Sequence, residues 1–404
     1  MGGDTGWDDR LLTTIRSARE LLSRELGIEA YLELETIFRG DGAEAVVLRC
    51  RVTGGPRGAP RTVIVKAFPG DHGEEASSSA RARLVNEWSG AVFVQSRRKG
   101  LVPTCYGGDA DAGVVLFEDL GDSVCLADML QDDDPRRAEE GLLTYATTLA
   151  RLHAATAGGH EAYEELRGAL AGASAEVEGI VYGERLREYL PGIRDACDTL
   201  GIRFPSRLET ETDQIVRHLH EPGPFFAFSL GDICPDNHRF VPVPEGEPAK
   251  IQFFDLESGG YRNAMLDAAY MLLPFPTCWC VNRLPDDLPN RLESAYRATL
   301  VEEGLIAAEG EAFGRALSEA MVAWFIATTH WSLTEALRER VHWGTSSHRQ
   351  RLPLRAENTA RICRRHRHMR LWADLAEQLA DELRKRWGKE AQMPLYPAFS
   401  GTKQ

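Results

Sequence analysis

An acidic stretch in the middle of the chain carries several side chains that could do chemistry. In "FSLGDICPDNHRF", residues 228–240, four residues separate Asp232 from Asn237. A carboxylate at the first position can accept the proton of an attacking hydroxyl group, and an amide oxygen at the second can bind a hard divalent cation. This D-x-x-x-x-N spacing is typical of loops that serve phosphoryl transfer. It predicts that Asp232 is a catalytic base and that Asn237 is a metal ligand.

A second acidic position follows at the end of the apolar run "IQFF", eighteen residues after Asn237. Asp255 ends this predicted strand, and a hairpin would return it beside the first loop. Mg²⁺ prefers oxygen ligands, so Asn237 and Asp255 are the predicted magnesium ligands. Glu257 points the same way two residues further along an extended segment and could assist.

A lysine closes the apolar strand "TVIVKAF". A buried ammonium is costly unless it is paired, and Glu87 in the following predicted helix, "LVNEWSGAV", is the natural partner for Lys66. A Lys/Glu pair of this kind aligns nucleotide phosphates. The alternative is a lysine at a strand end that extends its ammonium group into solvent.

Two further segments could contact a nucleotide. Gly40 and Gly42 in "FRGDGAE" stand at a predicted hairpin tip, where backbone N–H groups could approach a phosphate, although a plain hairpin turn explains these glycines equally well. In "VVLFEDLG", Glu118 and Asp119 interrupt an apolar strand, as a hinge between two lobes would.

The elements that must position these residues change character along the chain. A helix over residues 5–26 precedes strand-like segments up to about residue 118, and long helices follow. The helices are expected at 136–157, 176–200, 205–220, 287–303, 309–338 and 355–387. Strands followed by helices predict an α+β fold of two lobes. We expect a β-rich lobe over 1–117, a hinge over 118–122 and a helical lobe over 123–404.

The composition places limits on the class of protein. A chain of 404 residues with 43% hydrophobic and 27% charged residues is ordinary for a globular enzyme and long enough for two lobes. The net charge of -14 argues against general binding to nucleic acid or to anionic membranes. The segment 338–389 is the exception, since it carries 14 Lys or Arg and 6 Asp or Glu.

The eight cysteines are scattered and show no CxxC pairing, so reduced thiols are expected. The N-terminal "MGGDTGWDDRLL" has no signal-peptide pattern, and no apolar run is long enough to span a bilayer. We therefore expect a cytoplasmic protein.

The order of these features resembles the aminoglycoside phosphotransferase and choline kinase superfamily, whose members share a protein-kinase-like fold. The motifs that carry the resemblance are "VIVK", "LFEDLG", "LARLHA", "LGDICPDN" and "FFDLESGGYRNAMLDAAY", within about residues 30–275. One position departs from the family pattern. Leu230 stands where the family usually has a histidine that supports the geometry of the catalytic loop.

The resemblance implies a kinase that binds ATP and Mg²⁺. Asp232 would be the base, Asn237 and Asp255 the metal ligands, and Lys66 the phosphate contact with Glu87 as its partner. It further implies that the hinge backbone, from Glu118 to Leu120, holds adenine and that Asp267 braces the catalytic loop.

The expected activity is transfer of a phosphoryl group from ATP to a hydroxyl group of a small molecule, such as an antibiotic or a metabolite. Two alternatives are a Ser/Thr kinase that acts on a natural-product precursor peptide and a nucleotide-binding pseudokinase scaffold. The basic segment 361–372 could dock an acidic peptide, but a solvated helix face is the preferred interpretation.

Three other side chains have alternative interpretations. His153 is interpreted as a core histidine, whereas His238 could either approach a substrate or bind backbone. Cys278 and Cys280 form a Cys-x-Cys pair without a second pair of ligands, so packing is preferred over a metal or redox role.

Overall fold

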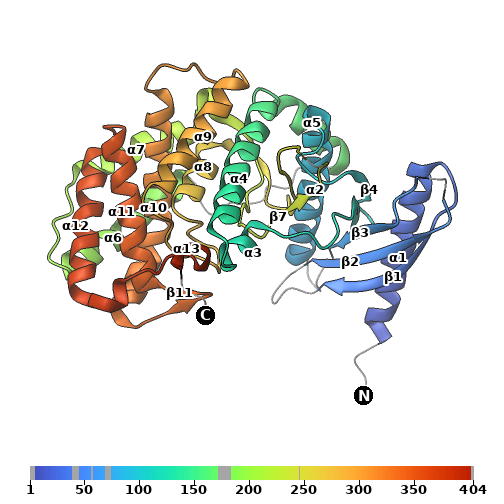
Figure 1. The fold of residues 1–404 in the computed structure, drawn as a ribbon, viewed down its shortest axis with the longest axis horizontal. Helices are drawn as coiled ribbons and strands as arrows, with labels where there is room; N and C mark the ends of the chain where they lie inside the picture. The colour runs from blue at the N-terminus through green and yellow to red at the C-terminus, as the bar shows by residue number, and fades with distance from the viewer. Residues whose placement is uncertain are drawn as a thin grey trace.

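The computed structural model describes residues 5–38, 45–55, 58–68, 74–171, 183–244 and 246–401. A small β-sheet lies at one end of the molecule and a larger group of helices at the other (Figure 1). This arrangement confirms the predicted α+β fold, with a β-rich lobe that precedes a helical one. Gly40 and Gly42 lie outside the described residues.

The sheet is antiparallel, with the strand order β1-β2-β3-β5-β4. Its strands are β1 (Tyr31–Phe38), β2 (Val46–Thr53), β3 (Thr62–Ala67), β4 (Cys105–Asp109) and β5 (Val114–Glu118). The strand that carries Lys66 therefore lies at the centre of the sheet.

The two faces of β3 meet different helices because side chains alternate along a strand. Val63 and Val65 are fully buried and share one apolar cluster with Leu22 of α1 (Thr5–Leu26). Lys66 points to the opposite face, where Phe68 packs with residues of α2 (Glu74–Arg97). The alternation thus turns the lysine toward α2.

The helix α2 joins the two lobes. Leu84 and Val85 pack in an apolar cluster beside the sheet, whereas Phe93 and Val94 belong to the core of the helical lobe. In Figure 1, α2 lies between the sheet and α5. Glu87 is therefore held at the junction of the lobes.

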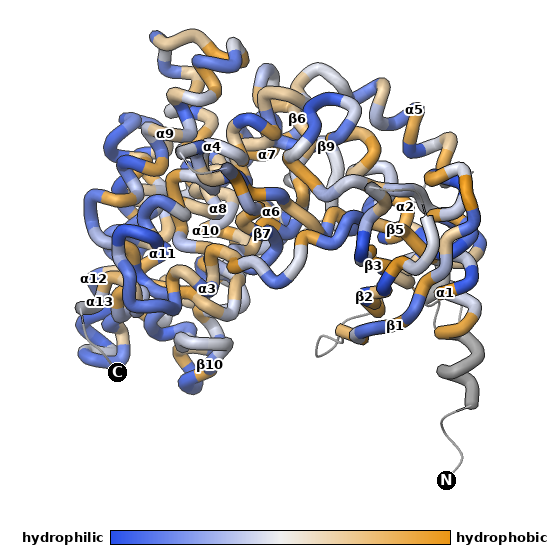
Figure 2. The backbone as a smooth tube through the Cα atoms, turned by 45° about the vertical axis from the view of Figure 1, so that its right-hand side comes forward, coloured by the Kyte–Doolittle hydropathy of each residue, from blue (hydrophilic) through white to orange (hydrophobic). Residues whose placement is uncertain are grey.

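The helical lobe is built from long helices around a buried centre. The structure gives α3 (Leu126–Gln131), α4 (Pro135–Thr156), α5 (His160–Ala171), α6 (Gly183–Thr199), α7 (Arg207–His220), α8 (Met265–Leu272), α9 (Leu288–Glu302), α10 (Ala312–Arg338), α11 (His348–Arg365), α12 (Arg370–Trp387) and α13 (Pro397–Ser400). Hydrophobic segments gather around α8 and α10, and hydrophilic ones around α11 (Figure 2). None of the described helices has the length and apolar composition to cross a membrane.

The prediction of one helix over 355–387 was wrong. The segment forms parts of α11 and α12, which pack against each other. Arg367 and Met369 adopt left-handed backbone conformations, each with φ of 54°, and these end the helical path. Apolar periodicity did not reveal the break because Ile362 and Met369 are buried on either side of it.

Two short antiparallel pairs interrupt the helices. β6 (Phe226–Ser229) pairs with β9 (Gly260–Asn263), and β7 (His238–Val241) pairs with β8 (Lys250–Phe253). The small hairpin of β10 (His342–Trp343) and β11 (Ser346–Ser347) precedes α11. The loop from 230 to 237 and the segment from 254 to 259 thus lie between paired strands.

Candidate active site

The pairing of β7 with β8 brings the two acidic stretches together. His238 is opposite Phe253, and the Phe254 N–H donates a hydrogen bond to the Asn237 carbonyl oxygen at 3.1 Å. Asn237 and Asp255 therefore flank the same end of one hairpin. Asp255 has a positive φ of 66°, an uncommon conformation for a residue other than glycine.

Lys66 joins the sheet to both α2 and this hairpin. Its Nζ donates to Glu87 Oε2 at 2.7 Å and to Glu257 Oε2 at 2.9 Å, and it also contacts Asp255 Oδ1. Lys66 is 8% exposed and Glu87 is 2% exposed. The lysine is thus a buried, paired group, and the interpretation of an ammonium extended into solvent does not hold.

Negative charge exceeds positive charge around this ammonium. Burial acts to lower the pKa of Lys66, but attraction by Glu87, Asp255 and Glu257 outweighs it and raises that pKa. Burial raises the pKa of Glu87 to about 7 although Lys66 opposes this, and the charges of Asp255 and Glu257 add to the increase. Arg83, with Nη1 at 3.5 Å from Glu257 Oε1, offsets part of the excess.

The same carboxylates lie close enough together to share one cation, and the Lys66 ammonium contacts all three of them. One oxygen from each of Glu87, Asp255 and Glu257 lies within 4.8 Å of the other two. Oxygen donors with excess negative charge are the environment that Mg²⁺ prefers. Asp255 belongs both to this set and to the hairpin end that carries Asn237.

Asp232 lies on the loop before β7, with its side chain exposed. Its Oδ1 accepts a hydrogen bond from the Cys234 N–H at 3.2 Å, and the Asn237 side-chain amide donates to the Asp232 carbonyl oxygen at 3.2 Å. The protein around the carboxyl group raises the pKa of Asp232 by desolvation, and the charges of Asp255 and Asp236 act in the same direction. A higher pKa makes the carboxylate a better proton acceptor.

A buried chain of hydrogen bonds anchors the start of this loop. Ser229 Oγ donates to Asp267 Oδ1 at 2.8 Å and accepts from the Gly231 N–H at 3.2 Å. Asp267 Oδ2 lies 3.1 Å from His153 Nε2, and His153 Nδ1 lies 2.7 Å from the Tyr296 hydroxyl oxygen. His153 is therefore a core histidine, and Asp267 contacts the loop through Ser229. Ser229 was not singled out in the sequence.

His238 and Leu230 both face the interior and are fully buried. The Leu126 N–H donates to His238 Nε2 at 3.2 Å, and burial lowers the pKa of His238 to about 3. A neutral imidazole that accepts a backbone hydrogen bond supports the structure. Of the two interpretations of His238, contact with a substrate or a hydrogen bond with the backbone, the structure supports the second.

The predicted hinge is tied to the sheet by side chains. The Glu118 carboxylate accepts hydrogen bonds from the Thr104 N–H at 3.0 Å and the Thr104 hydroxyl at 2.8 Å. Arg49 Nε lies 2.9 Å from Asp119 Oδ2, and the Leu120 carbonyl oxygen accepts from the Ser123 hydroxyl at 3.3 Å. Arg49 was missed in the sequence, although a charged residue in the apolar run "VVLRC" was a signal.

The basic segment near residue 365 is engaged within the molecule. Its side chains contact acidic residues of neighbouring helices: Arg364 forms ion pairs with Asp374 and Glu377, Arg365 forms one with Glu293, and His366 and His368 lie within hydrogen-bond distance of Glu293 and Glu319. These pairs reduce the charge that this face could offer to an acidic peptide.

Comparison with known proteins gives only distant structural matches. No protein-family model matches the chain, and no curated protein matches it. An ethanolamine kinase from Plasmodium vivax matches with 12% identity and a TM-score of 0.44, covering 82% of both chains. Choline kinase LicA from Streptococcus pneumoniae matches with 13% identity and a TM-score of 0.41, covering 87% of this chain and 98% of that one.

A structure of aminoglycoside 2'-phosphotransferase-IIIa in complex with GDP also matches, with 11% identity and a TM-score of 0.44. It covers 94% of this chain and 100% of that chain. This likeness is remote and assigns no function to the chain.

Proposed function

We propose that this chain is a phosphotransferase that moves the γ-phosphoryl group of ATP to a hydroxyl group of a small molecule with the aid of Mg²⁺. One observation supports this most strongly. Lys66 from the sheet, Glu87 from α2 and Asp255 from the helical lobe meet around one ammonium group. The loop with Asp232 and Asn237 adjoins them.

Each residue has a role that follows from its contacts. Lys66 is held at the lobe junction by Glu87, where its ammonium group would contact the phosphate oxygens of a bound nucleotide. Asp232 is exposed on its loop, where its carboxylate can accept the proton of an acceptor hydroxyl. The backbone from Glu118 to Leu120 would hold adenine.

Asn237 and Asp255, at the same end of the β7–β8 hairpin, would hold Mg²⁺ through their side-chain oxygens, and Glu257, whose carboxylate lies near that of Asp255, could assist. When bound, Mg²⁺ would offset the negative charge of the phosphates. Asp255 also contacts Lys66, so the positions of the Lys66 ammonium group and of the bound Mg²⁺ would depend on each other.

The ion pairs of the basic segment favour a small molecule over a precursor peptide as acceptor. An acidic peptide would have to compete with Asp374 and Glu377 for Arg364 and with Glu293 for Arg365. A pseudokinase scaffold could bind ATP at the same residues. It would differ from the proposed enzyme only in that it transfers no phosphoryl group to an acceptor.

The experiment compares wild type with Asp232→Asn and with Asp133→Asn, an exposed aspartate remote from the site in sequence. A library of hydroxylated metabolites and antibiotics is screened with ATP and Mg²⁺ for a mass gain of one phosphate. We expect Asp232→Asn to lower kcat about 10²- to 10⁴-fold while the thermal shift with ATP and Mg²⁺ persists. Asp133→Asn should behave as wild type.

Full phosphorylation by Asp232→Asn would refute the assignment of the base. A thermal shift with ATP and Mg²⁺ but no turnover on any acceptor would support the scaffold instead.

A further inference from the structure

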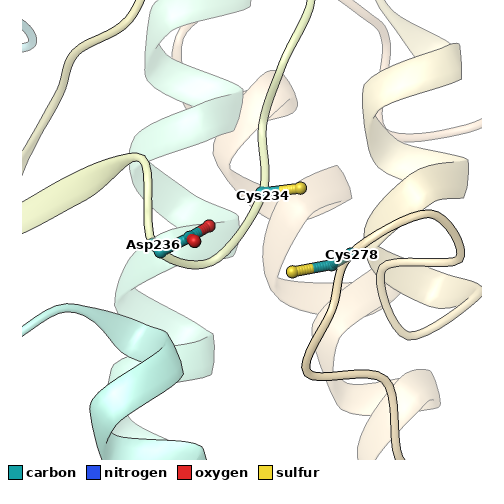
Figure 3. A group of neighbouring side chains, drawn as sticks. All are labelled: Cys234, Asp236 and Cys278. Carbon is teal, nitrogen blue, oxygen red and sulfur yellow. The ribbon is translucent and has the colours of Figure 1, made fainter. Parts of the chain in front are cut away.

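Two cysteines and an aspartate from separate segments meet next to the proposed base. Cys234 and Asp236 lie on the loop between Asp232 and Asn237, and Cys278 follows α8. Their sulfur atoms and one carboxylate oxygen all lie within 4.8 Å of one another. Figure 3 shows the carboxylate of Asp236 and the sulfur of Cys278 pointing toward each other from two loops, with Cys234 beside them.

The polar atoms of this cluster are incompletely satisfied. Asp236 Oδ2 accepts a hydrogen bond from Trp279 Nε1 at 2.9 Å, but Oδ1 is buried and has no hydrogen-bond partner within the described ranges. A buried carboxylate oxygen without a partner is costly. Cys278 is 2% exposed, whereas Cys234 and Asp236 are half-buried.

Two sulfurs and one carboxylate are a donor set for a thiophilic cation. Thiolates select zinc-type ions over Mg²⁺, and tetrahedral Zn²⁺ binds sulfur at about 2.3 Å and carboxylate oxygen at about 2.0–2.2 Å. Such a geometry places two ligand sulfurs about 3.8 Å apart, so the present separations require only small side-chain movements. We propose that Cys234, Asp236 and Cys278 form a binding site for a zinc-type divalent cation.

The charge balance of the site permits this. Binding converts two thiols to thiolates and releases two protons, so the cluster carries a net charge of about -1 before and after one divalent ion binds. Arg351 and Arg355 both donate to the Pro276 carbonyl oxygen just before Cys278, and in the described part of the chain neither forms an ion pair with a carboxylate. Without an ion both cysteines favour the thiol form, because hydrogen bonding and burial raise the pKa of Cys234 and of Cys278, so a bound ion must displace these protons.

A fourth ligand position would be left for water or for Cys280. The Cys280 sulfur lies 3.4 Å from the Cys278 sulfur, and Cys280 is fully buried. The sequence offered no second pair of ligands for Cys278 and Cys280, so packing was the preferred interpretation. The fold brings Cys234 and Asp236 close to Cys278.

The ion would tie the catalytic loop to the segment after α8. That segment is itself held by the β10–β11 hairpin, where the Thr345 N–H donates to the Trp279 carbonyl oxygen at 2.8 Å. The Cys234 N–H donates to Asp232 Oδ1, so a fixed Cys234 would orient that carboxylate. Cys234, Asp236 and Cys278 are therefore positioning residues.

The test uses Co²⁺ as a spectroscopic probe on the reduced full-length protein after treatment with a chelator. We expect one Co²⁺ per chain with a thiolate-to-cobalt charge-transfer band, which added Zn²⁺ removes. Cys234→Ser and Cys278→Ser should lose the band, and Asp236→Asn should bind at least tenfold more weakly. Cys105→Ser, at a half-buried cysteine of β4, should retain it.

Zinc content measured on the purified protein gives a second readout, with one equivalent expected in wild type and none in Cys234→Ser. Absence of the cobalt band in reduced wild type, or its persistence in the Cys234→Ser/Cys278→Ser double variant, would overturn the proposal. Neither readout involves ATP, so the metal site and the phosphotransferase activity succeed or fail separately.

Discussion

Replacement of Lys66 by Met tests whether this lysine is what keeps Glu87 ionised. Methionine keeps most of the apolar stem of lysine and removes the charge. Glu87 is 2% exposed and would then face Asp255 and Glu257 without its compensating cation. Loss of one partner of a buried ion pair costs about 3–5 kcal/mol when the remaining group stays charged.

Protonation of Glu87 limits this cost and makes it depend on pH. The folded pKa of Glu87 is about 7 in wild type, above its ordinary value of 4.5, and removal of Lys66 raises it further. A group with a raised folded pKa binds more protons in the folded state, so its folded state loses stability as pH rises through that window. At lower pH, protonation of Glu87 therefore relieves the unpaired charge that Lys66→Met leaves.

At pH 8, about one unit above the wild-type pKa of about 7, only the wild-type protein can ionise Glu87 readily. One pKa unit corresponds to about 1.4 kcal/mol, so Lys66→Met should lose about 1.4 kcal/mol more at pH 8 than at pH 6. The total loss at pH 8 should be about 3 kcal/mol.

Urea unfolding, monitored by tryptophan fluorescence at pH 6 and pH 8, gives the free energy of unfolding. It is measured for wild type, Lys66→Met, Glu87→Gln and the double variant. The double variant should show no such extra loss at pH 8, because its residue 87 cannot ionise. An equal loss for Lys66→Met at pH 6 and pH 8, unchanged when Glu87→Gln is added, would refute the reasoning.

Two further predictions concern buried groups near the catalytic loop. Burial lowers the pKa of His238 to about 3, so below pH 6.5 this histidine binds a proton in the unfolded state but not in the folded state. The free energy of unfolding should therefore fall by about 2 kcal/mol between pH 7 and pH 5. His238→Gln keeps an acceptor for the Leu126 N–H and should flatten that part of the pH profile of Tm; an unchanged slope would contradict this. Ser229→Ala removes the hydrogen bond to Asp267 and should lower the free energy of unfolding, measured by thermal unfolding, by about 1 kcal/mol. It should lower kcat while changing the KM for ATP less. An unchanged kcat would show that the catalytic loop does not depend on this hydrogen bond.

The parts of the site that could be predicted from the sequence depend on regularities that extend over only a few residues. The alternation of β3 sets the direction of Lys66, and the short return from β7 to β8 brings Asp255 to Asn237. Both follow from strand periodicity over a few residues. The remaining partner, Glu87, was predictable because it lies on the next helix along the chain.

Contacts between distant segments could not be predicted in the same way. Arg49 and Asp119 pair across the sheet, and Cys278 meets Cys234 only because the segment after α8 returns to the catalytic loop. No periodicity links these positions, and their proximity depends on how whole elements pack. The break between α11 and α12 was hidden for a related reason, since both sides of the turn bury apolar residues.

The support of the catalytic loop explains how Leu230 can occupy a position where the resembled superfamily usually has histidine. Leu230 is fully buried in the core of the helical lobe and offers no hydrogen bond. The loop is held instead on both sides of it, by Ser229, which bonds to Asp267, and by the Tyr145 hydroxyl, which donates to the Ile233 carbonyl oxygen at 2.5 Å. Because these buried bonds hold the chain at Ser229 and at Ile233, the short segment between them that carries the proposed base is supported without a polar side chain at residue 230.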